Sequence, residues 1–283
     1  MNFIRTLPLL GVLFLSPAKS PAQEAAESPL DLVIGGRHLV VPLPEGGFVR
    51  CDGIDPAWDK TIAATLPATN RLLASFGTRE NRQGIRDGRK IDFSRNFNIQ
   101  TLRSEESREL GTKAFAEIRA DIRKEIENMK ATLDAHLEKL AADGNRNLSR
   151  DLGIDAALEF SEAAVLGSFE DGDSALGFTL AMKVGSYAEG VPGKLPSVVA
   201  ALILPVNGRL LMLYSTSSYT GESDRLEVER SVKAWGAAIA AANPKVEGPG
   251  IFGASTLSVL IGAILGIALA LYLLLKRTHR PPA

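Results

Sequence analysis

The spacing of apolar residues predicts a mixed α+β domain in the middle of the chain. Between Glu105 and Asp143, apolar residues recur in steps of three and four, which places them on one stripe of a helix. The stripe comprises Phe115, Ile118, Ile122, Ile126, Met129, Leu133, Leu137 and Leu140. Gly144 stands at the usual stop position. We expect this helix to lie across a sheet, with a projecting coiled-coil arm as the alternative. Its opposite face is predicted to be solvated: Lys113, Glu117, Arg119, Asp121, Lys124 and Glu127.

Three hairpins are predicted from apolar runs that flank turn residues. Residues 32–34 and 38–43 flank Gly35-Gly36, and residues 163–169 and 176–184 flank the acidic turn 170–173. Residues 198–206 and 209–216 flank Asn207-Gly208. An Asn-Gly pair between apolar runs is the strongest short hairpin signal. An antiparallel sheet is therefore expected in the C-terminal half.

Two further helices and one strand complete the predicted domain. Asp55-Pro56 favours a helix start, and the helical pattern runs to about Phe76 with a kink at Pro67. Alternation from Ile91 to Ile99 indicates an extended segment. A last helix is expected over 224–242, with Asp224 and Glu227 at capping-box spacing and Asn243-Pro244 as its stop. Its predicted buried stripe is Val228, Val232, Trp235 and Ile239.

The two ends predict export and membrane anchoring. Arg5, a short apolar run and the small residues before Ala22 have the layout of a secretory signal, with Ala18 as a second cleavage site. Residues 255–275 are uncharged and long enough to cross a bilayer as a helix. The basic residues that follow favour a cytoplasmic C-terminus. Within this span Gly262, Gly266 and Ala270 share one face and favour close helix packing, as in a homodimer.

Together these patterns predict an α+β fold: an antiparallel sheet packed by a long amphipathic helix and a C-terminal helix, followed by one transmembrane helix. The expected layout is a signal peptide (1–22), a flexible segment (23–30), an extracytoplasmic α+β domain (31–243), a linker (244–253), a transmembrane helix (254–275) and a cytoplasmic tail (276–283).

Composition and charge narrow the compartment and the partners. Of 283 residues, 45 % are hydrophobic and 23 % are charged, which is a globular balance. All 33 acidic residues lie within 23–250, while five of the 32 basic residues lie outside it, so the middle is acidic. That balance speaks against nucleic-acid binding. The single cysteine, Cys51, allows no internal disulfide and favours a bacterial periplasmic domain of an inner-membrane protein.

No motif identifies a reaction. The chain lacks HExxH, CxxC, GxSxG and P-loop signatures, and only His38 and His136 lie outside the tail. Residues 248–253 match GxGxxG in form but precede a membrane helix instead of following a strand, so they are interpreted as linker. Asp171 and Asp173 are interpreted as turn residues and not as calcium ligands. No cofactor and no metal site are expected.

One basic segment interrupts the acidic domain. It contains Arg79, Arg82, Arg86, Arg89, Lys90, Arg95 and Arg103. Gly84 and Gly88 suggest a mobile loop there, and the alternative is a solvated loop balanced by neighbouring acids. Such a patch fits an anionic lipid surface, an acidic envelope polymer or an acidic protein.

The sequence thus predicts a single-pass periplasmic protein that binds, scaffolds or assists envelope assembly without catalysis. The expected partners are membrane lipid, a protein partner or second copy, and an anionic envelope component. A membrane-tethered enzyme of unfamiliar type, built around His38 or clustered carboxylates, is one alternative. An accessory ligand-sensing subunit is another.

Overall fold

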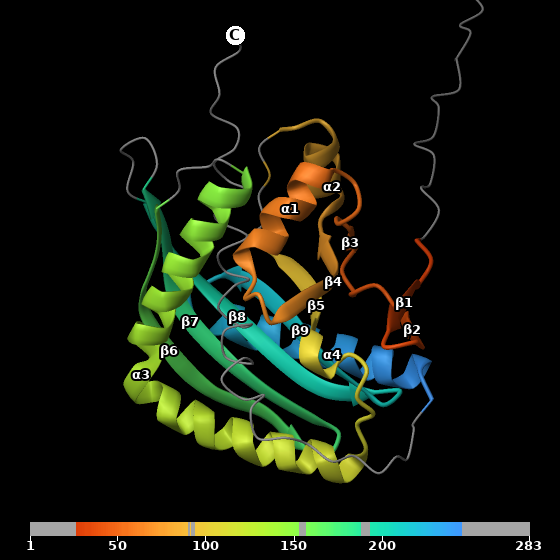
Figure 1. Ribbon diagram of the computed structural model, residues 1–283. Coiled ribbons are helices and arrows are strands. Elements are labelled where there is room, and N and C mark those ends of the chain that lie inside the picture. The colour runs from red at the N-terminus through yellow and green to blue at the C-terminus, as the bar shows by residue number, and fades with distance from the viewer. Residues whose placement is uncertain (1–26, 90, 92–93, 153–156, 188–192, 245–283) are drawn as a thin grey trace, which may run out of the picture.

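The computed structural model describes residues 27–89, 91, 94–152, 157–187 and 193–244 (Figure 1). The predicted signal peptide and membrane span lie outside these residues. No helix in the described part of the chain is long and apolar enough to cross a membrane. The elements are β1 (Leu30–Ile34), β2 (Arg37–Val41), β3 (Val49–Arg50), α1 (Pro56–Thr65), β4 (Asn70–Gly77), α2 (Arg79–Arg86), β5 (Asn96–Leu102), a 3-10 turn (Arg103–Glu105), α3 (Thr112–Leu152), β6 (Ala157–Gly172), β7 (Ala175–Tyr187), β8 (Gly193–Val206), β9 (Arg209–Ser218) and α4 (Glu222–Ala242).

Seven strands form one antiparallel sheet in the order β3-β4-β5-β9-β8-β7-β6. The chain leaves β5, crosses the sheet through α3 to the far edge, and returns as the meander β6 to β9. The strands β1 and β2 pair separately as a hairpin. The mixed α+β architecture and its antiparallel sheet are therefore confirmed.

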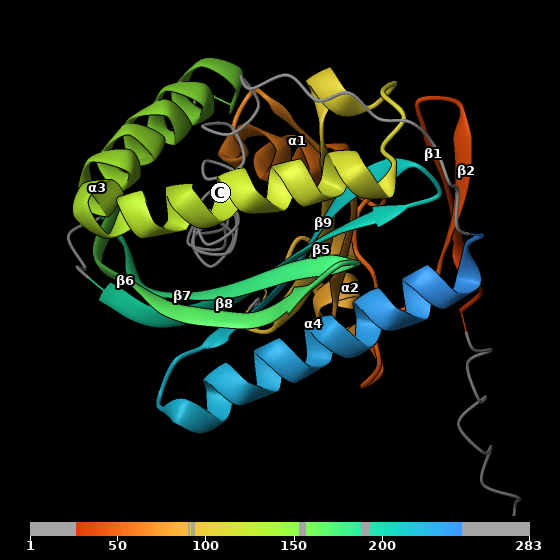
Figure 2. The same cartoon turned by 90° about the horizontal axis from the view of Figure 1, so that it is seen from below.

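Helix α4 packs on one face of the sheet, and α3 lies on the opposite side (Figure 2). The predicted α4 stripe is buried as expected. Trp235 makes edge-on ring contacts with Phe76 and Phe97 at centroid distances of 5.3 and 5.4 Å. A Cβ atom on Gly236 would lie 2.4 Å from Leu202 Cδ2, so this glycine lets helix and sheet approach closely.

The β1–β2 and β8–β9 hairpins follow the predicted turns, whereas the predicted turn 170–173 is wrong in part, because β6 continues through Asp171 to Gly172. Asn207 and Gly208 have φ values of +46° and +72°, the left-handed pair that suits a tight hairpin turn. The β6–β7 tip turns through Asp173 and Ser174. Guanidinium groups on α3 hold this tip: Arg119 pairs with Asp173 at 3.0 Å, and Arg123 pairs with Asp171. The prediction that Arg119 faces solvent is wrong, because its side chain turns inward to the hairpin and is only 14 % exposed.

Strand β6 forms one edge of the sheet and pairs irregularly with β7. The register shifts at three places between residues 161 and 170. Glu162 and Gly167 adopt φ values of +53° and +135° at these bulges. Bulges of this kind increase strand twist and interrupt the ladder at an edge.

Several predicted boundaries are wrong. Helix α1 ends at Thr65, and residues 70–77 form β4, because they pair with β5 in the register Phe76 to Phe97. Strand β5 is displaced to 96–102 from the predicted 91–99. Helix α3 continues through Gly144 to Leu152, since Gly144 is buried where α3 packs on α1. The projecting-arm alternative is wrong for the same reason, because α3 contacts α1 and β6.

Candidate functional site

The basic segment begins with a helix, α2, instead of the predicted mobile loop. The Thr78 hydroxyl accepts a hydrogen bond from Asn81 N–H and caps its start. Gly88 ends it with φ at +62°, and Arg89 N–H donates to the Gly84 carbonyl at 2.8 Å, which closes the terminus. Ile85 points inward to a small core with Cys51, Trp58, Ile62 and Ile91.

The anchoring of Ile85 forces the charged face of α2 outward. Arg79, Gln83 and Arg86 are exposed and recur at the spacing of one helix face. A hollow of about 260 Å³ lies on this face, lined by Arg79, Glu80, Arg82, Gln83 and Arg86. Arg86 makes no ion pair with any residue that the structure describes. We call Arg79, Arg82, Gln83 and Arg86 the α2 basic face.

Arg82 ties the α2 basic face to the start of the domain. Its guanidinium pairs with Glu27, and its side chain is 16 % exposed. Glu27 also accepts a hydrogen bond from Arg50 N–H. The structure describes residues 27–30 of the predicted flexible segment 23–30. This part is fixed to the domain, because Glu27 is ion-paired with Arg82 and β1 already begins at Leu30.

The remaining basic residues of the segment do not join this face. Arg89 pairs with Asp87 at 2.7 Å. Arg95 pairs with Glu227 on α4 and lies over the Phe48 ring. Arg103 is exposed at the other end of β5, beside Thr69. Lys90, Gly262, Gly266 and Ala270 lie outside the described residues.

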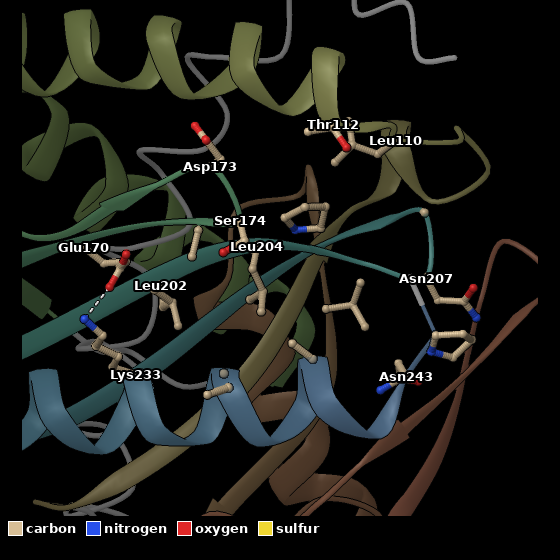
Figure 3. Close-up of a pocket in the computed structure, with 18 residues that line it drawn as sticks. Leu110, Thr112, Glu170, Asp173, Ser174, Leu202, Leu204, Asn207, Lys233 and Asn243 are labelled. Carbon is tan, nitrogen blue, oxygen red and sulfur yellow. Dashed lines mark ion pairs between the residues drawn. The ribbon is translucent and has the colours of Figure 1, made fainter. Parts of the chain in front are cut away.

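A second hollow, of about 500 Å³, lies between α4 and the tips of two hairpins (Figure 3). Leu202, Leu204 and Val206 of β8 form its floor, and the small residues Gly236, Ala237 and Ala240 of α4 form one wall. Asp173, Ser174, Asn207, Lys233 and Asn243 stand around it. We call this space the α4 hollow.

Sequence reasoning missed the α4 hollow, because its walls come from segments far apart in the chain. The run Trp-Gly-Ala-Ala-Ile-Ala-Ala-Ala (235–242) is the one signal that pointed to it, since small residues leave space beside a helix. The run was instead interpreted only as part of an amphipathic helix.

His38 does not line the α4 hollow, and the two carboxylates that do, Glu170 and Asp173, are ion-paired with Lys233 and Arg119. His38 lies on the exposed face of the β1–β2 hairpin, 3.0 Å from an Asp31 oxygen. Cys51 is fully buried, and burial raises the pKa of its thiol to about 12. In the described part of the chain, no three His, Cys, Asp or Glu side chains are grouped so that they could hold a metal ion.

A cluster of carboxylates near the start of α1 is used for structure. Asp52 accepts hydrogen bonds from Arg50 and from Ser75 N–H, the latter at 2.7 Å. Asp59 accepts from Gly53 N–H at 3.0 Å. Burial raises the pKa of Asp59, with smaller contributions from Asp52 and Asp55. These bonds fix the loop between β3 and α1.

Helix α2 and the C-terminal end of α4 lie at different ends of the domain (Figure 1). Arg95, just before β5, pairs with Glu227 in the first half of α4. The start of β5 pairs with the end of β4, and β4 leads directly into α2. At the other end of α4, Asn243 contacts Val40 and the α4 hollow opens. A helix of 21 residues is about 32 Å long. The α2 basic face and the point where the chain leaves α4 are therefore well separated.

Comparison with known proteins adds little. No protein-family model and no curated protein match the chain. Among solved structures, the solution structure of cyanobacterial PsbP (CyanoP) from Synechocystis sp. PCC 6803 is weakly similar, with a TM-score of 0.26 and 12 % identity over 82 % of this chain and 100 % of that chain. A TM-score this low carries no information about function.

Proposed function

We propose that this chain is a membrane-anchored extracytoplasmic binding protein that contacts an anionic partner through the α2 basic face. The observation that carries the proposal is the exposure of Arg79 and Arg86 on one side of a short helix whose other side is fixed by Ile85. Arginine side chains on a folded helix suit carboxylate or phosphate groups better than those on a mobile loop, because less backbone entropy is lost on binding. No catalytic step is part of this proposal.

The position of the face favours a partner away from the chain's own membrane. The predicted span begins ten residues after Pro244, at the end of α4 that is distant from α2. Lipid headgroups of that membrane would meet the hairpin tips before they met α2. An acidic protein or an acidic envelope polymer therefore fits the α2 basic face better than the anchoring bilayer.

The test is a binding measurement with charge-reversal variants of the full-length protein. Immobilised polyglutamate serves as the model polyanion, and binding is measured at several salt concentrations. Arg79→Glu combined with Arg86→Glu is expected to weaken binding by about tenfold and to flatten its salt dependence. Arg103→Glu is the matched control, because Arg103 is also exposed but lies at the other end of β5. Equal losses in both variants would refute a role specific to α2.

A further inference from the structure

The α4 hollow lies where the described chain ends. Asn243 and Pro244 are themselves among its lining residues, so the next residues start at its rim. Whatever follows Pro244 must pass beside this space. The position of the exit therefore makes the following segment the nearest candidate to fill it.

The charged and amide side chains at the rim already have partners, Asp173 with Arg119 among them, which favours an apolar occupant. Lys233 Nζ pairs with a Glu170 oxygen at 2.5 Å. Both atoms of the Asn243 amide are engaged with backbone groups, and Asn207 Nδ2 donates to the His38 carbonyl at 3.0 Å. The floor of leucine and valine side chains has no polar atom to offer. A charged ligand would find no free counter-charge among these rim groups.

The residues after Pro244 contain a suitable apolar pair. They read Lys-Val-Glu-Gly-Pro-Gly-Ile-Phe-Gly over 245–253. Pro249-Gly250 favours a turn that reverses the chain, since proline presets the first central position and glycine accepts positive φ at the next. Phe252 is eight residues from Pro244, within about 26 Å of extended chain. After a reversal it can return to the hollow.

We propose that Phe252, with Ile251 beside it, occupies the α4 hollow, so that the linker folds back onto its own domain. The space is of the size that small apolar ligands occupy in proteins. Because the linker is short, the effective concentration of Phe252 at the hollow is high. The domain is then held in one orientation next to residue 254 and does not swing on an extended tether. This proposal does not depend on what the α2 basic face binds.

The first test is disulfide formation in the full-length protein. Ala237→Cys combined with Gly253→Cys places one thiol in the hollow wall and one on the linker, and it leaves Phe252 intact. Ala238→Cys combined with Gly253→Cys is the matched control, because Ala238 is also exposed, at the next position of α4, but does not line the hollow. Cys51 is buried and does not compete. The 237 pair is expected to form at least ten times faster, and equal rates would overturn the proposal.

The second test asks which residue fills the space. The rate of maleimide labelling of Ala237→Cys is measured with Phe252 present and with Phe252→Ser. Loss of the phenyl ring is expected to raise labelling at 237 several-fold and to leave Ala238→Cys unchanged. If position 237 is protected equally in both backgrounds, lipid or another protein fills the hollow and the proposal is wrong. If it is unprotected in both, the hollow is empty and the proposal is also wrong.

Discussion

The side-chain amide of Asn243 pairs with the backbone of Val40 as a neighbouring strand would. Asn243 Oδ1 accepts from Val40 N–H at 2.9 Å, and Nδ2 donates to the Val40 carbonyl at 2.7 Å. The same nitrogen donates to the Ile239 carbonyl at 2.7 Å. One side chain thus caps the last turn of α4 and provides hydrogen-bond partners for the outward backbone groups of Val40 on β2.

Asn243→Ala should lower the free energy of unfolding by about 1–3 kcal/mol, because Val40 and Ile239 lose partners in a partly buried place. Asn243→Asp should lose at least as much, since a carboxylate cannot donate to either carbonyl. Denaturant unfolding of the full-length protein in detergent, followed by circular dichroism, measures both. An unchanged midpoint for Asn243→Ala would show that water replaces the amide.

Arg209 is a second long-range tie. Its guanidinium is buried and donates to the carbonyls of Ile34, Gly35, Arg108 and Gly208 at 2.8–3.2 Å. Burial lowers its pKa, and the nearby charge of Arg37 adds to this effect. It joins the β1–β2 turn, the loop before α3 and the β8–β9 turn.

Arg209→Met should destabilise the domain by about 2–4 kcal/mol, since buried carbonyl groups would lose their donors. Arg209→Lys should restore less than half of that loss, because an ammonium group cannot reach all four acceptors in a planar fork. The same unfolding measurement applies. Arg37→Met is the control: its ion pair with Glu109 is largely exposed, and removing it should cost less than about 1 kcal/mol.

Gly35 and Gly36 form the β1–β2 turn but should differ sharply on substitution. Both have positive φ, at +52° and +77°. A Cβ atom on Gly35 would lie 1.9 Å from the Glu106 carbonyl oxygen, whereas nothing lies within 4 Å of one on Gly36. Gly36→Ala should cost only the backbone penalty of about 1–2 kcal/mol. Gly35→Ala should cost clearly more, because the 103–110 loop must move. Equal unfolding midpoints would contradict the close approach.

Asp224 should make stability depend on acid pH. Its carboxylate accepts from Thr220 N–H and Oγ at 2.6 and 2.7 Å and from Gly221 N–H, and these bonds lower its pKa below the ordinary 3.8. The folded state therefore releases this proton more readily than the unfolded chain does. The stabilisation is complete above pH 3.8 and disappears as pH falls through the lower folded value. Asp224→Asn should lower the melting temperature at neutral pH and reduce its further fall between about pH 5 and about pH 2. A parallel pH profile in both proteins would contradict this role.

The sequence predicted correctly those elements that depend on interactions between residues close together in the chain. Asn207-Gly208 fixes its hairpin through backbone conformation alone, and the α4 stripe reports a single buried face. The α4 start was misplaced because Asp224 and Glu227 have capping-box spacing, yet Asp224 is the third residue of the helix and reaches back to Thr220. Residues 70–77 looked helical because only pairing with β5 makes them a strand.

The candidate sites depend on contacts that spacing cannot reveal. Arg82 meets Glu27 from 55 residues away, and Arg95 meets Glu227 from 132 residues away. These two pairs divide a continuous basic segment into parts that lie on different elements. Helix α2 itself has one strong apolar residue, Ile85, so its amphipathic pattern was too short to recognise. The α4 hollow needs β8, α4 and two hairpin tips together.

The bulges at Glu162 and Gly167 bear on how this domain behaves when many copies are crowded together. A long straight outer strand would let an adjacent molecule continue the hydrogen-bond ladder and start a growing fibre. Along β6, the ladder breaks at three places, so no long run of outward N–H and C=O groups keeps a regular spacing. Copies crowded side by side can therefore touch without templating one another into aggregates.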